Sequence, residues 1–94
     1  MAVARVVSFD GVDSGRIAEL ASEIESGEQP EGMNATEMLL LHDADADQAL
    51  AIIFFDNDED YQKGHEILDA MPAGDTPGRR NSVTKYQVAT RMTA

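Results

Sequence analysis

Two short apolar runs constrain the fold of this chain more than any other feature of its sequence. Met38–Leu41 and Leu50–Phe55 contain no polar residue, and the acidic segment Asp43–Asp47 lies between them. Uninterrupted apolar runs of this length, separated by turn-forming residues, predict the two strands of a β-hairpin. A strand with helices on one side only normally alternates apolar and polar residues, so we expect both faces of these strands to be buried.

A strand and an amphipathic helix are predicted before the hairpin. Val3–Phe9 is rich in β-branched and apolar residues, which predicts the first strand. Asp13 or Ser14 is expected to cap the following helix, and Gly27 is expected to end it. The apolar stripe of this helix recurs at helical spacing and consists of Ile17, Leu20, Ala21 and Ile24.

A second helix and a last strand are predicted after the hairpin. Asn57 or Asp58 is expected to cap the helix, and the turn-forming residues 72–78 are expected to end it. One face of this helix carries Tyr61, Gly64, His65, Leu68 and Met71. The last strand is predicted over 82–92. The complete order predicts a ferredoxin-like βαββαβ α+β fold, with a four-stranded antiparallel sheet and two helices on one face.

The length of 94 residues indicates a single ferredoxin-like domain that spans residues 1–94. One layer of helices covers only one face of a sheet, and a chain of this length has no third layer for the other face. The simplest cover is another copy of the same sheet, so we expect a homodimer packed sheet to sheet into an α+β barrel. The competing interpretation is an exposed apolar groove that receives a ligand or a different protein.

Composition argues against several classes of function. The net charge of −11 argues against a nucleic-acid partner, because phosphate binding needs clustered Lys and Arg. The absence of cysteine excludes disulfides and thiolate metal sites. No apolar stretch is long enough for a signal peptide or a membrane span, so we expect a cytoplasmic protein without a membrane partner. Arg79 and Arg80 lie in a locally basic C-terminal segment and are expected to pair with acidic residues.

Two acidic repeats and two histidines are the remaining candidates for a metal site. Asp43–Asp47 and Asp56–Asp60 imitate the opening of a calcium loop, but neither is followed by the required Gly and Glu. We interpret them as a hairpin tip and a helix N-terminus. His42 and His65 alone do not define a zinc site. No metal, no cofactor and no catalytic residue can be assigned from these motifs.

The whole chain resembles the dimeric α+β barrel superfamily, in its antibiotic-biosynthesis-monooxygenase-like branch. The resemblance is carried by the element order and by Leu50–Phe55 running through Asp56–Asp60 into a helix. It is also carried by Thr76–Arg80 followed by Val83–Val88, which is similar to a segment of uncharacterised actinobacterial members. The resemblance implies that the sheets of two copies pair around a mainly apolar cavity.

Members of this superfamily include cofactor-independent quinone-forming oxygenases and haem-degrading oxygenases. The haem-degrading members use an Asn on the first strand, a Trp near the end of the third strand and a His on the second helix. His65 matches the histidine, but Phe55 stands in place of the Trp, and Val3–Phe9 contains no Asn. A fold that supports several reactions does not select one of them.

Our leading hypothesis is a dimeric protein that binds a small apolar or aromatic molecule in a cavity between the helices and the sheet, with monooxygenase-like activity as a further expectation. One alternative is a non-catalytic structural or interaction module that acts through its dimer interface. A second alternative is a haem-binding oxygenase. The residues expected to line the cavity are Phe9, Leu40, Phe54, Phe55, Tyr61, His65 and Leu68.

Overall fold

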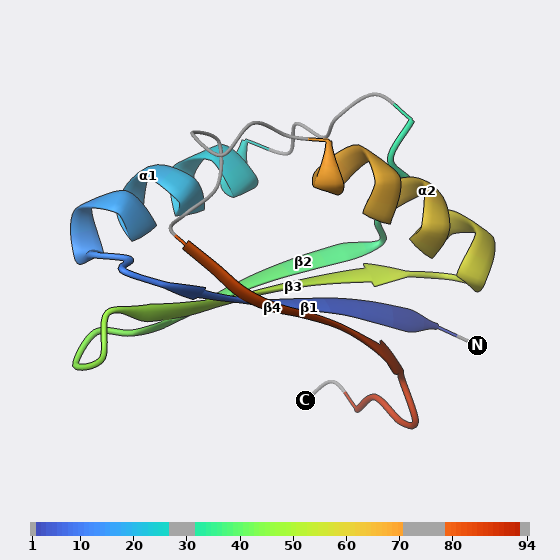
Figure 1. Cartoon of the computed structure of the whole chain (residues 1–94). Helices are drawn as coiled ribbons and strands as arrows, with labels where there is room; N and C mark the ends of the chain where they lie inside the picture. The colour runs from blue at the N-terminus through green and yellow to red at the C-terminus, as the bar shows by residue number, and fades with distance from the viewer. Residues whose placement is uncertain (1, 27–31, 71–78, 93–94) are drawn as a thin grey trace.

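The computed structural model describes residues 2–26, 32–70 and 79–92. Its elements follow the predicted order (Figure 1): β1 (Val3–Asp10), α1 (Ser14–Glu25), β2 (Glu37–Asp43), β3 (Gln48–Phe55), α2 (Asp58–Asp69) and β4 (Arg79–Gln87). The predicted ferredoxin-like α+β fold is therefore confirmed. Three predicted features fall outside the described residues: the helix stop at Gly27, the helix-face residue Met71 and the loop 72–78.

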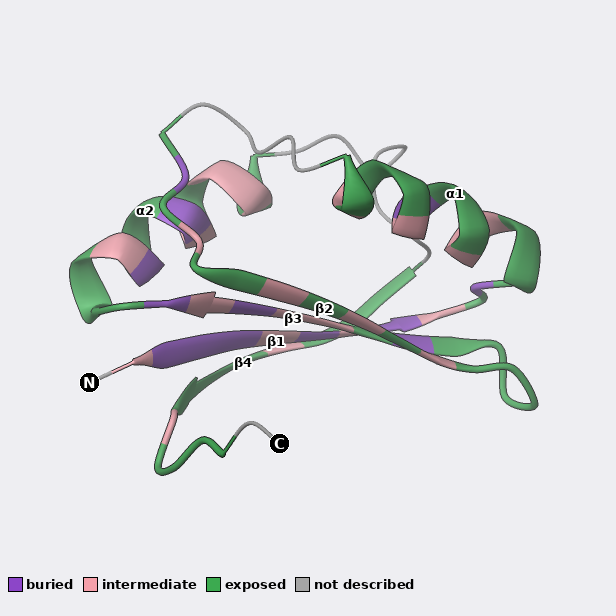
Figure 2. Cartoon of the chain, turned by 180° about the vertical axis from the view of Figure 1, so that it is seen from behind, coloured by how far each residue is buried: buried purple, intermediate pink, exposed green. Residues whose placement is uncertain are grey.

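The four strands form one antiparallel sheet in the order β2-β3-β1-β4. Both helices lie on the same side of this sheet (Figures 1 and 2), so the other side has no helix over it in the described chain. We call this uncovered side the open face. None of the helices in the described part of the chain is both long and apolar enough to cross a membrane.

Each helix is capped by the earlier of its two predicted capping residues, Asp13 for α1 and Asn57 for α2. The Asp13 carboxylate accepts a hydrogen bond from the backbone N–H of Arg16 at 2.8 Å. The Asn57 side chain accepts one from the backbone N–H of Asp60 at the same distance. These contacts satisfy amides that a helix leaves without intrahelical partners at its first turn, which fixes where both helices start.

Two apolar clusters fill the space between the helices and the sheet. The cluster under α2 consists of Val3, Met33, Ile53, Phe55 and Tyr61, and the cluster near α1 consists of Val7, Phe9, Val12 and Ala49. A Cβ atom at Gly64 would overlap the Phe55 ring, so a glycine in α2 allows the helix to lie directly on β3.

The last strand differs from its prediction at both ends. β4 runs over Arg79–Gln87, whereas the sequence pattern predicted 82–92. Just past this strand the Val88 N–H donates a hydrogen bond to the Ala2 carbonyl at 2.9 Å, one residue before β1 begins. The chain beyond Val88 therefore has almost no neighbouring strand left to pair with, and it turns beneath the open face instead (Figure 1).

Candidate functional site

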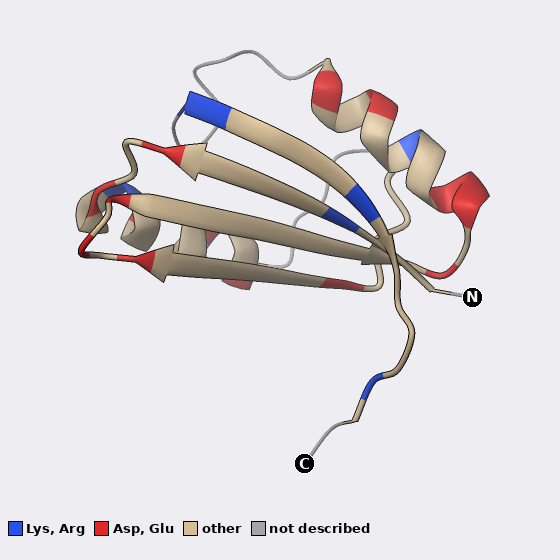
Figure 3. Cartoon of the chain, turned by 60° about the horizontal axis from the view of Figure 1, so that its bottom comes forward, with Lys and Arg blue, Asp and Glu red and all other residues tan. Residues whose placement is uncertain are grey.

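The open face is apolar along its middle. The strand register places Leu39 of β2, Ile52 of β3 and Val6 of β1 in one row across the sheet. Large apolar side chains remain exposed there, with exposed fractions of 40% for Leu39, 47% for Leu41, 37% for Leu50 and 54% for Tyr86. Charged positions lie mostly toward the strand ends (Figure 3), and the charged residues at mid-strand, Arg5 and Lys85, face the helices by register.

The C-terminal segment covers one end of the open face. The Arg91 guanidinium lies 4.4 Å from the centroid of the Phe54 ring and forms an ion pair with Glu37. Met92 next to it is 89% exposed. Because Glu37 and Phe54 pair in the sheet at the end far from the β2–β3 turn, the segment leaves the middle of the face uncovered.

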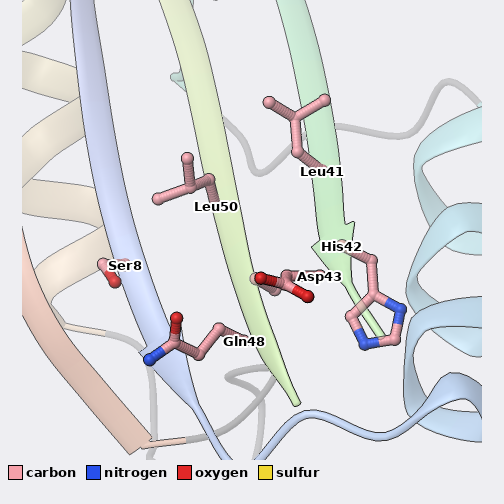
Figure 4. Close-up of a pocket in the computed structure, with 7 residues that line it drawn as sticks. Ser8, Leu41, His42, Asp43, Gln48 and Leu50 are labelled. Carbon is pink, nitrogen blue, oxygen red and sulfur yellow. The ribbon is translucent and has the colours of Figure 1, made fainter. Parts of the chain in front are cut away.

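A pocket of about 300 Å³ lies at the other end of the open face, beside the β2–β3 turn (Figure 4). It is lined by Ser8, Leu41, His42, Asp43, Gln48, Ala49 and Leu50. Two of its polar side chains have partners: the Gln48 amide donates to Asp10 at 3.1 Å, and His42 Nε2 lies 2.9 Å from the Val12 carbonyl oxygen. The lining of the pocket is mixed, since Leu41, Ala49 and Leu50 are apolar and the other four residues are polar or charged.

Arg5 is the most unusual residue on the covered side of the sheet. Its side chain is only 3% exposed, and its Nε donates a hydrogen bond to His65 Nδ1 at 3.2 Å. Its Nη2 lies 3.6 Å from Asp69 Oδ1 and has no hydrogen-bond partner among the described residues. Burial, and then the nearby Arg80, lower the pKa of Arg5 from its ordinary value. The guanidinium is thus buried at a cost that its partners do not fully offset.

The imidazole of His65 connects Arg5 to helix α2. Its ring stacks on Tyr61 with the centroids 5.8 Å apart and the planes 7° from parallel. Arg5 Nε can only donate, so Nδ1 of His65 accepts, and the proton of the neutral ring lies on Nε2. That atom is 3.4 Å from Asp69 Oδ2. Both ring nitrogens of His65 therefore face protein partners.

Asp69 accepts the strongest contact of the group from β4. Arg80 Nη1 lies 2.7 Å from Asp69 Oδ1, and this hydrogen bond is the main reason that the pKa of Asp69 is lowered. A register shift between Ser8 and Phe9 places Arg80 opposite Phe9, on the helix side of the sheet. We call Arg5, His65, Asp69 and Arg80 the α2 polar cluster.

Lys85 adds a further positive charge beside α2. Its Nζ lies 2.8 Å from Asp58 Oδ1 and 5.0 Å from the centroid of the Tyr61 ring. The hydrogen bond from Lys85 lowers the pKa of Asp58. Arg80 and Lys85 of β4 therefore both pair with acidic residues of α2. The predicted pairing of Arg79 and Arg80 with acidic residues is confirmed, with Arg79 lying 3.8 Å from Asp10.

The seven predicted cavity residues lie in four different places. Phe55, Tyr61, His65 and Leu68 lie together under α2, Phe9 belongs to the cluster near α1, and Leu40 pairs with Ala51 on the helix side of the sheet. Phe54 is on the open face, because successive residues of a strand point to opposite sides. None of the seven lines the pocket beside the turn. Their binding of a ligand stays a prediction.

Sequence reasoning missed Arg5 as the partner of His65. A signal was present, since Arg5 is the one charged residue at the alternating positions whose other members are Val3, Val7 and Phe9. A charged residue at such a position needs a buried partner. That partner lies sixty residues away on α2, so only the packing of helix against sheet identifies it.

Metal binding gains no support from the described residues. No group of three or more His, Asp or Glu side chains in residues 2–26, 32–70 and 79–92 is arranged to hold an ion. In the β2–β3 turn the Asp43 carboxylate accepts from the backbone N–H groups of Asp45 and Ala46. The interpretation of this acidic repeat as a hairpin tip is therefore confirmed.

The arrangement around His65 does not fit a haem ligand. Coordination of iron through either ring nitrogen would displace Arg5 or Asp69, and the loss of His65 would leave the buried Arg5 Nε without a partner. Phe55 also packs against Gly64, so α2 lies too close to β3 at this point to admit a macrocycle between them.

Comparison with known proteins does not place the chain in a family. No protein-family model matches it, and neither the curated proteins nor the solved structures contain a match. The resemblance to the dimeric α+β barrel superfamily therefore remains a prediction from sequence.

Proposed function

We propose that this protein acts as a sheet-to-sheet homodimer that binds a small organic molecule. The observation that carries the proposal is the open face, where large apolar side chains stay exposed in the single chain. Exposed apolar surface of this kind marks an interaction site. The strand register makes it continuous across three neighbouring strands.

A second copy is the occupant that best fits this surface. The middle of the face has no charged side chain by register, so two chains of net charge −11 can meet there without burying a charge. The flat area of a sheet of four strands of about eight residues is on the order of 500 Å² per copy, and the uneven surface of the side chains adds to it. Small stable interfaces bury about 600 Å² per partner, so the face is of the right size.

The small molecule is proposed to bind beside α2 rather than at the interface between copies. In the Tyr61–His65 stack the Tyr61 ring is buried, and the ring of His65, whose side chain is 30% exposed, is the aromatic surface that a ligand can reach. Aromatic surfaces favour ligands with a ring. Monooxygenase-like turnover in the cytoplasm would extend this proposal, and its support is the resemblance to the dimeric α+β barrel superfamily.

The dimer is tested by light scattering coupled to size-exclusion chromatography. The wild type is expected to elute as a dimer, and Leu41→Glu is expected to elute as a monomer because it places a charge within the interface. Ala18→Glu introduces the same charge on the exposed surface of α1 and should leave the dimer intact. A wild type that stays monomeric at every accessible concentration overturns the proposal.

The second candidate function is an interaction module without a ligand. It is favoured by the packing under α2, where Phe55 fills the space next to Gly64 and is fully buried. A panel of small aromatic molecules separates the two functions. Binding that is lost in Tyr61→Leu, with the dimer preserved, supports the ligand-binding function, whereas a panel without any binder supports the module.

A further inference from the structure

We propose that Arg5, His65 and Arg80 form a binding site for the carboxylate of a small aromatic acid, and that Asp69 occupies this site when no ligand is bound. The inference rests on the proposed small-molecule function and names the class of its ligand.

Three donors converge on the carboxylate of Asp69. Arg80 Nη1 lies 2.7 Å from Oδ1, His65 Nε2 lies 3.4 Å from Oδ2, and Arg5 Nη2 lies 3.6 Å from Oδ1. Two guanidinium groups therefore share one carboxylate, and one positive charge of the α2 polar cluster is left unmatched. In a chain of net charge −11 this is a local site of opposite sign, which attracts an anion.

Asp69 is an imperfect occupant of this site. The 3.6 Å separation from Arg5 Nη2 exceeds the length of a hydrogen bond, and Nη2 has no other hydrogen-bond partner in the described chain. Buried polar groups are almost always hydrogen-bonded, so this one favours a further acceptor. The Asp69 side chain is 47% exposed and can turn toward solvent. A ligand carboxylate could then bind the donors of both arginines at shorter distance.

The neighbouring rings indicate that the acid is aromatic. His65 contacts the cluster through its nitrogens and stacks on Tyr61 through its face, so an oxyanion site and an aromatic surface meet at one residue. An aromatic acid combines a planar ring with a carboxylate at its edge. Such a molecule matches both features at once.

Benzoate is the simplest probe of this site. We expect it to shift the backbone amide signals of α2 and β1 in a titration followed by NMR, and to bind about tenfold more tightly than its neutral isostere benzamide. Inorganic phosphate tests whether the oxyanion alone suffices. Binding of phosphate without binding of benzoate would overturn the assignment of an aromatic acid.

Three variants test the roles of the residues. Asp69→Asn removes the internal competitor and should tighten benzoate binding about fivefold, whereas Arg80→Gln should weaken it about tenfold. Arg79→Gln is the matched control on the same strand, because Arg79 is 85% exposed and points to Asp10. It should leave benzoate affinity unchanged.

Two results with the variants contradict the inference. One is an Asp69→Asn variant that binds benzoate no more tightly than the wild type, and the other is a loss in Arg79→Gln equal to that in Arg80→Gln. Equal affinity for benzamide and benzoate would also show that the site does not recognise a carboxylate, but it would be consistent with the proposed small-molecule function. If no aromatic molecule binds, the proposed small-molecule function itself is contradicted. The dimer is tested independently by light scattering.

Discussion

The two faces of the sheet differ in how much of their apolar surface the chain itself buries. On the covered face the helices enclose two apolar clusters and even a guanidinium, whereas on the open face comparable apolar side chains are left at the surface. Phe54 and Phe55 show the contrast most simply, since they are neighbours in the chain but lie on opposite faces. The comparison shows that one chain completes only one side of its sheet.

Truncation of these two phenylalanines is the strongest test of the comparison. Phe55 is fully buried under α2, so Phe55→Ala should reduce the free energy of unfolding by about 3–5 kcal/mol at any protein concentration. Phe54→Ala should have a smaller effect, because the Phe54 ring is only partly buried by its own chain, through Arg91 of the C-terminal segment. The share of the loss that comes from burial by a second copy should grow with protein concentration. Urea unfolding at several concentrations measures both. Equal, concentration-independent losses would contradict the distinction between the faces.

The contact between Gly64 and Phe55 offers a test confined to the covered face. Alanine is the better helix former by about 1 kcal/mol, so Gly64→Ala would stabilise an isolated helix. Here the added methyl group overlaps the buried Phe55 ring, and we expect a net loss of about 1–3 kcal/mol. Gly15→Ala in α1 is the matched control, since its Cβ meets only the Asp13 side chain at 3.4 Å. A gain in stability for Gly64→Ala in urea unfolding would show that α2 does not lie this close to β3.

The smallest expected effect concerns acid stability at the edge of the covered face. The hydrogen bond from Arg80 lowers the pKa of Asp69 in the folded state, so the unfolded state binds more protons as the pH falls. The stabilising contribution is present above the pKa of an unfolded aspartate, and it is lost as the pH falls through the lower pKa of the folded state. Arg80→Gln should therefore flatten the loss of stability below about pH 4. If the free energy of unfolding falls equally with pH in the wild type and in the variant, this role is contradicted.

Local sequence pattern was sufficient to predict the element order. The apolar runs at Met38–Leu41 and Leu50–Phe55 marked the two strands without homologous sequences, and the capping residues marked the helix starts. These features depend on contacts within a few residues. The end of β4 depends on where its neighbour β1 begins, so the alternation beyond Gln87 predicted strand where β1, as far as the structure describes it, offers no further pairing.

The candidate site was less predictable, since its geometry is set by tertiary packing. His65 was expected on the inner face of α2, but its contact with Arg5 depends on how that helix sits on β1. The position of Arg80 depends on the irregular register between β1 and β4, which turns it toward Asp69. The sequence of β4 predicted neither the irregularity nor the convergence of three donors on one carboxylate.

Native mass spectrometry of the protein purified under non-denaturing conditions tests the central claim most directly, because one spectrum reports both the number of chains and any retained ligand. The account predicts a species of twice the mass of the chain, with or without additional bound mass. A spectrum that contains only the single chain, at concentrations where other small dimers persist, would contradict the proposal that a second copy covers the open face.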